Sequence, residues 1–458
     1  MTAIDWLFQR MEDYAEREAL IADGAVVRYD ELSANCERWR NRLEEWQIRP
    51  GEAVWLEGDY ELNVCGALLA LIANRNIAVP ATKASAFRAP LLQEMAGVSV
   101  ILQKRNGEWE AERRDAAQQF SHKLLNGIAA SGKPGLVLFS SGSTGEPKGI
   151  VHDLSKLLER YRTPRAAFRT VSFLLFDHIG GLNTLLHTLS NGGSVIVPAS
   201  RKPDDVCSVV ERYRAELLPA SPSFLHLLLL SDIRSRYDLS SLKVITYGTE
   251  VMPASTLESL NRLLPDVQYR QTYGLSELGI MRAKSESSDS LWMRIGGEGM
   301  ETRIVDGVLH IRSDTAMEGY LNAPNPFDEE GWFNTQDRVE IKGELVRILG
   351  RQSELINVGG QKVFPAEIES VLLLMPQIED AAVVGRAHPL LGQVPEAIVN
   401  VRNGESTDPM TIKNLIRNHC RDKLAPFQIP VYVTIQIEPL LTERFKKIRK
   451  SASSVSKD

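Results

Sequence analysis

Short apolar runs that alternate with helical patterns are the feature that most restricts the fold of this chain. Residues 53–58 (AVWLEG), 135–140 (GLVLFS) and 242–248 (LKVITYG) are typical of strands. Residues 63–74 (NVCGALLALIAN) are typical of a buried helix. Strands that alternate with helices indicate an α/β sheet with helices on its faces. We therefore expect an α/β fold.

The pattern changes in the last third of the chain. Residues 302–313 and 339–350 predict short antiparallel strands, with a hairpin turn at residues 342–343. We expect a large N-terminal domain over residues 1–350, in which helices flank mixed β-sheets and one part resembles a small β-barrel. Residues 351–458 contain helices and strands of their own and have the size of a small α+β C-terminal domain.

Charge and hydropathy exclude several classes of partner. The 458 residues include 53 Lys and Arg against 59 Asp and Glu, so the net charge is −6. A mildly acidic chain is poorly suited to nucleic acid or an anionic membrane surface. The longest apolar stretch, residues 64–73, is about half as long as a bilayer span. The N-terminus predicts an amphipathic helix and not a signal peptide, so we expect a cytoplasmic protein without a membrane span.

The cysteines and histidines form no metal or disulfide pattern. The four cysteines contain no CxxC pair, and the eight histidines contain no HExxH motif. The cysteines are Cys36, Cys65, Cys207 and Cys420. Their wide spacing predicts buried free thiols in a reducing compartment.

A Gly- and Ser-rich segment, residues 139–149 (FSSGSTGEPKG), carries the strongest chemical signal. It follows an apolar strand and precedes the helix-like run 153–162, which argues against a flexible linker. Small residues allow backbone N–H groups and hydroxyls to surround phosphate oxygens, and Lys148 adds a positive charge. A Walker A loop is excluded because Lys148 precedes Gly149 and no Gly-Lys-Ser/Thr follows. The predicted phosphate ligands are Ser140, Ser141, Gly142, Ser143, Thr144, Gly145 and Lys148.

This segment resembles the phosphate loop, [ST]SG[ST]TGxPKG, of the AMP-forming adenylating superfamily, which includes acyl-CoA synthetases, peptide-synthetase adenylation domains and luciferases. Five further blocks are similar to family motifs and occur in the family's order. They are FDHIGGLN at 176–183, YGLSE at 273–277, GWFNTQD at 331–337, GRQSELI at 350–356 and GGQKVFPAEIE at 359–369. The chain is therefore identified as a member of this superfamily.

The resemblance implies roles for residues that would bind Mg²⁺ and the ribose of ATP. Glu277 is expected to be a catalytic metal ligand, since Mg²⁺ prefers carboxylate oxygens. Ser276, where the family has Thr, would contact a phosphate oxygen. Asp337, expected in a loop, would accept hydrogen bonds from both ribose hydroxyls, and Arg351 would touch the ribose. Gln336 replaces a Gly that is usual beside this Asp.

The adenine of ATP is expected at a turn that resembles the family's adenine-binding segment. This turn follows the strand 242–247 and consists of Gly248, Thr249 and Glu250. Tyr273 would stack on the adenine face, and Gly274, which follows it, is also expected to bind ATP.

The pocket for a carboxylic acid is expected around residues 177–182. His178 would gate this pocket or approach the forming adenylate. Asp177 has two alignments: it is either an extra residue beside the gate or the Asp that grips an α-amino group in amino-acid-activating relatives. The predicted pocket residues are Asp177, His178, Leu182, Phe224, Gly248 and Leu278. Their few charges point to an apolar or aryl acid.

The segment 440–450 (LLTERFKKIRK) looks like the family's catalytic-lysine segment, PxTxxGKIxR. Matching the Lys-Ile pair assigns the catalytic role to Lys447. Lys446, which then stands where Gly is usual, is the second candidate. The resemblance also implies that the small domain rotates about Arg351 and the pivot Ser353. The rotation would bring Gly359 and Gly360 over a thiol tunnel.

The expected reaction uses ATP and Mg²⁺ to convert a carboxylic acid into an acyl-adenylate, with release of pyrophosphate. A thiol then attacks the adenylate and AMP leaves. No motif contains a Cys, so the thiol is expected from CoA, as in an acyl-CoA ligase, or from the phosphopantetheine of a separate carrier protein. A third interpretation is a luciferase-like or catalytically divergent adenylate-binding relative.

Overall fold

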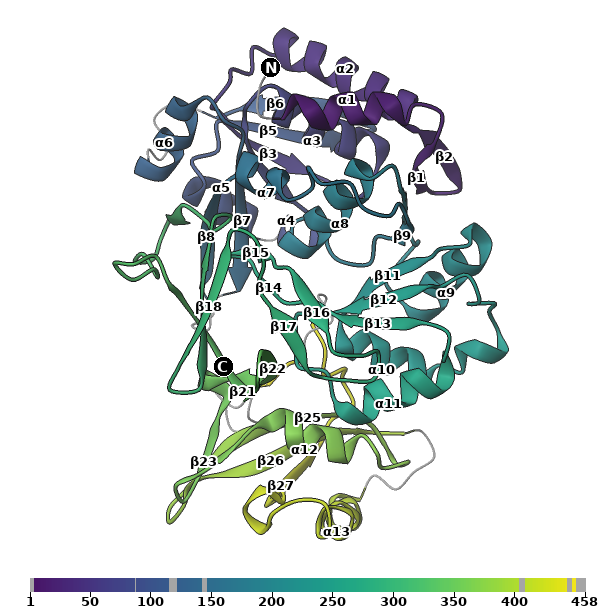
Figure 1. Cartoon of the computed structure of the whole chain (residues 1–458), viewed down its shortest axis with the longest axis vertical. Coiled ribbons are helices and arrows are strands. Elements are labelled where there is room, and N and C mark those ends of the chain that lie inside the picture. The colour runs from purple at the N-terminus through teal and green to yellow at the C-terminus, as the bar shows by residue number, and fades with distance from the viewer. Residues whose placement is uncertain are drawn as a thin grey trace.

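The computed structural model describes residues 4–86, 88–114, 122–141, 146–402, 408–442 and 447–449. Its elements form two seven-stranded sheets, a six-stranded antiparallel sheet and a separate C-terminal sheet (Figure 1). The α/β class, the large N-terminal domain and the small α+β C-terminal domain are confirmed. No helix within the described ranges is long and apolar enough to cross a bilayer.

The first large sheet has the strand order β20-β8-β7-β4-β3-β5-β6. Its central strands β7, β4, β3 and β5 are parallel, and β6, β8 and β20 pair antiparallel at its edges. The strands are β3 (Ala53–Glu57), β4 (Ile77–Ala81), β5 (Val100–Arg105), β6 (Glu108–Arg113), β7 (Gly135–Ser141), β8 (Pro147–Asp153) and β20 (Gly319–Tyr320).

The second large sheet has the order β13-β12-β11-β9-β10-β1-β2 and is parallel except for the β1–β2 hairpin. Because β11, β12 and β13 are parallel, the turns after them lie at one edge of the sheet, where α/β proteins bind ligands. The strands are β1 (Glu18–Ala22), β2 (Ala25–Arg28), β9 (Arg169–Val171), β10 (Ser194–Ile196), β11 (Leu217–Ala220), β12 (Val244–Tyr247) and β13 (Gln268–Gln271).

Helices between and around these sheets supply most of the large domain's core. One core cluster joins side chains of α1, α2, α3, α7 and α8 to the first sheet, and α3 is buried along most of its length, as its apolar sequence predicts. Helices α9, α10 and α11 pack on the second sheet. The helices are α1 (Asp5–Asp13), α2 (Tyr29–Glu45), α3 (Leu62–Ala73), α4 (Lys83–Ala86), α5 (Ala89–Met95), α6 (Lys123–Ser131), α7 (Leu154–Glu159), α8 (Ile179–Ser190), α9 (Pro203–Tyr213), α10 (Pro222–Leu230) and α11 (Ala254–Leu263). Cys36, Cys65, Cys207 and Cys420 are buried free thiols.

A six-stranded antiparallel sheet forms the expected barrel-like part of the large domain. Its order is β16-β17-β22-β21-β19-β18, and β21 and β22 form the hairpin predicted at residues 342–343, with Gly343 at φ +61°. The strands are β16 (Ala283–Ser285), β17 (Met293–Ile295), β18 (Met300–Val305), β19 (Val308–Ser313), β21 (Phe333–Lys342) and β22 (Leu345–Arg351). A two-stranded hairpin, β14 (Gly274–Leu275) and β15 (Gly279–Ile280), lies nearby.

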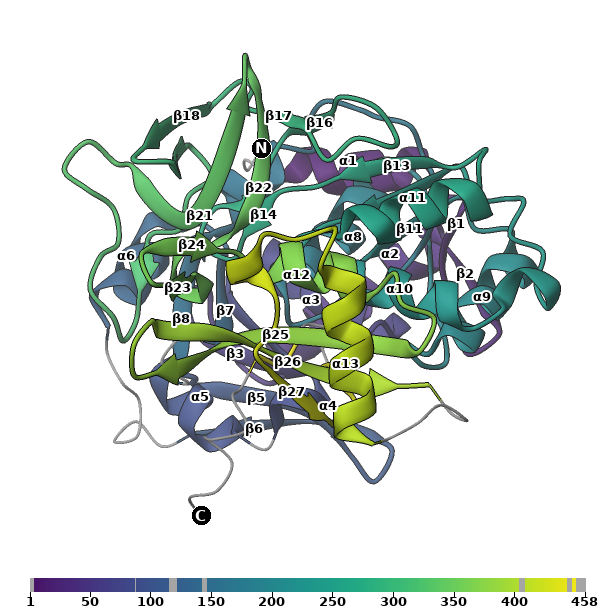
Figure 2. The same cartoon turned by 90° about the horizontal axis from the view of Figure 1, so that it is seen from below.

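The C-terminal sheet has the order β24-β23-β26-β25, with β27 beside β26. Its elements are β23 (Ile356–Val358), β24 (Gln361–Val363), α12 (Pro365–Leu372), β25 (Ile378–His388), β26 (Gly392–Val401), α13 (Pro409–Cys420) and β27 (Tyr432–Ile435). Figure 2 shows this sheet nearest the viewer, with α12 toward the large domain. The predicted domain boundary at residue 350 falls within β22, and the division into 1–350 and 351–458 stays a proposal.

Candidate active site

The predicted phosphate loop joins two antiparallel strands. Ser140 of β7 pairs in register with Lys148 of β8. Strand β8, whose residues Ile150 and Val151 are buried in the sheet, therefore separates the loop from helix α7. Four of the predicted ligands, Gly142, Ser143, Thr144 and Gly145, and the side chain of Ser141 lie outside the described residues.

Tyr320 connects the loop lysine to the predicted metal ligand. The Lys148 ammonium lies 5.0 Å from the centre of the Tyr320 ring. The hydroxyl of Tyr320 donates a hydrogen bond of 2.7 Å to Oε1 of Glu277. The predicted phosphate-binding lysine and the predicted metal ligand thus contact the same aromatic residue. The sequence analysis did not identify Tyr320, because its role depends on contacts between segments that are far apart in the chain.

The turn that carries Ser276 and Glu277 lies between β14 and β15 and is fixed by buried hydrogen bonds. His152 Nε2 donates to the carbonyl oxygen of Ser276 over 2.7 Å, and the backbone N–H of Met317 donates to the carbonyl of Glu277 over 2.8 Å. Burial lowers the pKa of His152 to about 4, so this residue is a neutral donor. Because Tyr320 contacts Oε1, Oε2 of Glu277 fits a Mg²⁺ ion that keeps waters and phosphates as its other ligands.

Asp337 lies in strand β21 and not in the expected loop. Burial alternates along this strand, with Phe333, Thr335 and Asp337 facing inward, which explains the strand conformation. Its Oδ2 accepts a hydrogen bond of 2.5 Å from the Tyr273 hydroxyl, and its Oδ1 lies 3.5 Å from Nε of Arg351. Burial raises the pKa of Asp337, although the nearby Arg351 guanidinium lowers it. The structure therefore brings three predicted nucleotide-binding residues together.

The predicted adenine turn is tightly packed and strained. A Cβ on Gly248 would lie 2.6 Å from Oγ1 of Thr272, so this position requires glycine. Thr249 has φ +73°, a conformation that β-branched residues rarely adopt. Ser223 donates a hydrogen bond of 2.5 Å to Oε2 of Glu250. Such strain often occurs at ligand-binding segments.

The predicted acid-pocket residues are placed in different surroundings. His178 caps helix α8, accepting a hydrogen bond of 3.3 Å from the Gly180 N–H. Asp177 is buried, and its Oδ2 accepts a 3.0 Å hydrogen bond from the Thr82 hydroxyl, which ties α8 to the end of β4. Leu182 lines a crevice behind α8. Phe224 and Leu278 are fully buried core residues, and Phe224 packs on Phe173. The pocket role of these residues stays a proposal.

Lys447 is buried in the small domain in this structure. Its ammonium lies 3.1 Å from Oδ1 of Asp380 and donates to the carbonyl of Ala381. Burial alone would lower the pKa of Lys447, but Asp380 and Glu369 raise it. Lys446 lies outside the described residues, so the choice between the two lysines stays a prediction.

The small domain docks on α10 and α11 of the large domain. His226 Nε2 donates to the carbonyl of Glu379 over 3.0 Å, and Ser255 donates to the carbonyl of Ser370 over 3.0 Å. The predicted pivot Ser353 lies in a short 3-10 helix, Gln352–Glu354. The turn with Gly359 and Gly360 is exposed, and its N–H groups donate to Leu391 and Asn357 within the small domain.

Comparison with known families agrees with this arrangement. Residues 7–321 match the model of the AMP-binding enzyme family, and residues 367–446 match that of the AMP-binding enzyme C-terminal domain. The chain belongs to the AMP-binding enzyme family.

Relatives of this AMP-binding enzyme include proteins named as CoA ligases. The Humulus lupulus protein named probable CoA ligase CCL5 is 31% identical over 312 residues, which cover 61% of this chain and 56% of that protein. The chain spans a little over half the length of the curated relatives it matches.

Solved structures share the fold of this AMP-binding enzyme. The anthranilate CoA ligase AuaEII in complex with anthranoyl-AMP has a TM-score of 0.82 at 20% identity, covering 98% of this chain and 95% of that chain. The o-succinylbenzoate CoA synthetase of Bacillus subtilis in complex with ATP and magnesium has a TM-score of 0.73 at 22% identity, covering 96% and 98%. At these identities the likeness shows the fold.

Proposed function

We propose that this enzyme activates a carboxylic acid with ATP and transfers the acyl group to the thiol of CoA. In the first step a carboxylate oxygen attacks the α-phosphorus, and the bond to pyrophosphate breaks. In the second step the thiol sulfur attacks the acyl carbon, its proton is lost, and AMP leaves. The contact of Tyr320 with both Lys148 and Glu277 is the observation that carries this proposal.

The residues around Tyr320 would hold the triphosphate by charge and position. Lys148 would bind the phosphates that become pyrophosphate. Glu277 would hold Mg²⁺, which neutralises phosphate charge when it is bound. Such preorganised contacts contribute to catalysis because they already point at developing charge.

The nucleoside would bind between β13, β21 and the turn after β12. Asp337 would accept hydrogen bonds from the ribose, and its hydrogen bond from Tyr273, the residue predicted to stack on adenine, supports this role. Arg351, at the end of β22, would contact the same ribose. Thr249 and Glu250 would contact the adenine.

One lysine from residues 446–447 would neutralise charge at the α-phosphate. The burial of Lys447 and its pairing with Asp380 support Lys446 for this role, since a paired ammonium is not available to substrate. A rotation about Arg351 and Ser353 would then bring Gly359 and Gly360 to the thiol tunnel.

Pyrophosphate release from ATP and Mg²⁺, measured with a panel of free acids and no thiol, tests the proposal. We expect release with one acid class and its loss in Glu277→Gln, while Glu318→Gln, a nearby carboxylate that pairs with Lys156, serves as the matched control. Adding CoA or a phosphopantetheine-loaded carrier protein then identifies the acceptor. No pyrophosphate with any acid, from folded protein that binds ATP, would refute the proposal.

A further inference from the structure

Residues 317–322, which we call the brace, contact both the predicted metal turn and the strand that follows the phosphate loop. The backbone N–H of Met317 donates a 2.8 Å hydrogen bond to the carbonyl of Glu277. Three residues later, Tyr320 of β20 pairs in register with Ile150 of β8. The side chains of Met317 and Tyr320 are buried, so the brace is anchored in the core of the large domain.

Backbone pairing between the brace and β8 ends next to Lys148. Strand β20 ends at Tyr320, and the N–H of Leu321 donates a last hydrogen bond of 2.8 Å to the carbonyl of Gly149. A Cβ on Gly149 would lie 2.9 Å from Cδ1 and 3.2 Å from Cβ of Leu321, so glycine allows this close approach. The backbone on either side of Lys148 therefore needs partners from another source.

The side chain of Asn322 supplies these partners. Its Oδ1 accepts a 3.1 Å hydrogen bond from the N–H of Gly149, and its Nδ2 donates a 2.8 Å hydrogen bond to the carbonyl of Pro147. The N–H can only donate and the carbonyl can only accept, so these two groups fix the orientation of the Asn322 amide. The amide presents an acceptor and a donor side by side, as a residue of a neighbouring strand would.

The two hydrogen bonds hold the peptide groups on both sides of Lys148. On the other edge of β8, Lys148 pairs in register with Ser140 of β7. Fixed peptide groups set the direction of the Cα–Cβ bond, which limits where the ammonium of Lys148 can lie. That ammonium lies 5.0 Å from the centre of the Tyr320 ring. Asn322 thus holds the backbone of Lys148, and Tyr320 contacts its charged end.

Asn325, in the same part of the chain, shows the more usual behaviour of an exposed asparagine. Its Oδ1 accepts a 3.2 Å hydrogen bond from the N–H of Phe327 and so stabilises its own turn. Asn322, in contrast, bonds a residue 173 positions away in the sequence. Its contacts therefore serve the phosphate loop and not the local turn.

We propose that Asn322 is a positioning residue for ATP, which directs the ammonium of Lys148 to the phosphates that leave as pyrophosphate. Asn322 acts through Lys148, so its loss weakens contacts to the β- and γ-phosphates and leaves contacts to the nucleoside unchanged. This role rests on the proposed function, in which Lys148 binds these phosphates.

The test compares ATP with AMP, which lacks the β- and γ-phosphates. The Kd of each nucleotide is measured by calorimetry with the full chain and Mg²⁺, in the absence of any acid. Asn322→Leu raises the Kd of ATP roughly 5- to 30-fold, the effect of losing one or two hydrogen bonds, and leaves the Kd of AMP within about twofold. General damage to the fold would weaken both nucleotides alike.

Two further variants locate the effect. Asn325→Leu removes the amide three residues further along and leaves both Kd values within about twofold of the wild type. Asn322→Ser, whose side chain is too short to bridge Pro147 and Gly149, shows the same selective loss of ATP affinity as Asn322→Leu and replaces it if leucine prevents folding. An unchanged ratio of the ATP and AMP Kd values in the folded Asn322 variants overturns the inference.

Pyrophosphate release separates this inference from the proposed function. If wild-type enzyme releases pyrophosphate with an acid and the Asn322 variants keep the wild-type ratio of Kd values, the function stands and the role of Asn322 is wrong. If the variants lose ATP affinity selectively and no acid releases pyrophosphate from the wild type, Asn322 positions Lys148 and the proposed reaction is wrong.

Discussion

Two groups of basic residues in this enzyme differ in how their charge is neutralised. In the small domain, Arg449 makes a bidentate pair with Glu369, at 3.0 Å and 2.9 Å, and Lys447 pairs with Asp380. Burial alone would raise the pKa of Glu369, but Arg449 and Lys447 lower it. This group, Lys447 and Arg449, is the paired cluster.

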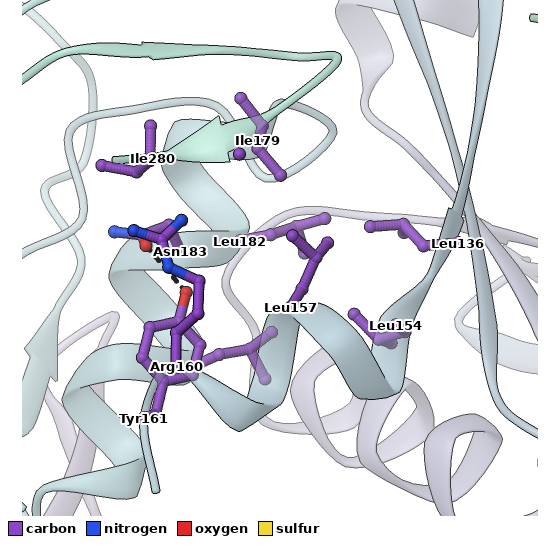
Figure 3. A pocket seen from close by; sticks show the side chains of 11 residues that line it. Leu136, Leu154, Leu157, Arg160, Tyr161, Ile179, Leu182, Asn183 and Ile280 are labelled. Carbon is purple, nitrogen blue, oxygen red and sulfur yellow. Dashed lines mark hydrogen bonds between the residues drawn. The ribbon is translucent and has the colours of Figure 1, made fainter. Parts of the chain in front are cut away.

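The other group consists of Arg160, which lines the crevice behind α8 (Figure 3), and of Arg165 and Arg282, which lower its pKa. None of the three has an ion pair with a carboxylate among the described residues, and we call this group the unpaired cluster. Removing one member of a buried ion pair leaves the other charge buried without a partner and lowers stability, whereas removing a charge that has no partner leaves no such charge behind. Loss of an arginine is therefore expected to have different consequences in the two domains.

The largest expected effect is on stability. Arg449→Met leaves the buried Glu369 carboxylate without its partner and lowers the free energy of unfolding by about 3–5 kcal/mol. Arg160→Met removes an unpaired charge and changes stability by less than about 1 kcal/mol in either direction. Urea unfolding measures both, with Arg40→Met, which breaks an exposed pair with Glu37, as the control. Equal losses of unfolding free energy in Arg449→Met and Arg160→Met would contradict the difference between the two clusters.

The next prediction distinguishes a catalytic lysine from a structural lysine at residues 446–447. Lys446→Ala lowers the rate of pyrophosphate release by about 10²–10³, because a charge on the developing phosphate oxygens is lost, and leaves stability unchanged. Lys447→Ala lowers stability, since Asp380 loses its partner. Single-turnover kinetics together with urea unfolding distinguish the two. Loss of adenylation in a fully stable Lys447→Ala enzyme would assign the catalytic role to Lys447.

A smaller effect concerns pH and the unpaired cluster. Burial lowers the pKa of His187 to about 4, and Arg165 and Arg160 contribute to this shift. Between the ordinary pKa and pH 4 the unfolded chain binds a proton that the native state does not, so stability falls as pH falls. His187 contributes a loss of about 2 kcal/mol between pH 6.5 and pH 5. Unfolding of wild type and His187→Gln across this range measures it.

One outcome would contradict this prediction. Identical pH profiles of wild type and His187→Gln would show that the cluster does not perturb this histidine.

The smallest effect is at Gln336, which has φ +64° beside Asp337. A left-handed conformation disfavours side chains other than Gly, so Gln336→Gly raises stability by about 1 kcal/mol. It leaves both basic clusters unchanged and is the reference for a purely backbone effect. A destabilised Gln336→Gly, measured by thermal unfolding, would show that the Gln side chain makes a favourable contact.

The sequence predicts the large features well because they depend on local patterns. Apolar runs such as 63–74 and 135–140 form the expected helix and strand, and the turn at Gly343 lies where it is predicted. The strand containing Asp337 was missed because a Trp-Phe pair followed by polar residues resembles a loop, whereas only the sheet reveals that every second residue faces inward.

The features that distinguish this chain depend on contacts over long sequence separations. Tyr320 acquires a role only when β20 lies beside β8 and near Glu277. Arg160 follows Glu159 at the end of α7, where charged residues are typical of a solvated helix end, and the fold places it beside Gly279. Neither arrangement has a pattern that could be read from neighbouring residues.

The way in which the two domains dock has a consequence for exchanging domains between related enzymes. Side chains of the large domain, His226 and Ser255, donate to main-chain carbonyls of the small domain at Glu379 and Ser370. A carbonyl oxygen is present whatever the side chain, so a small domain of different sequence and the same backbone path offers the same acceptors. These two hydrogen bonds between the domains therefore tolerate divergence of the small domain's sequence. Chimeras that carry the small domain of a relative retain them.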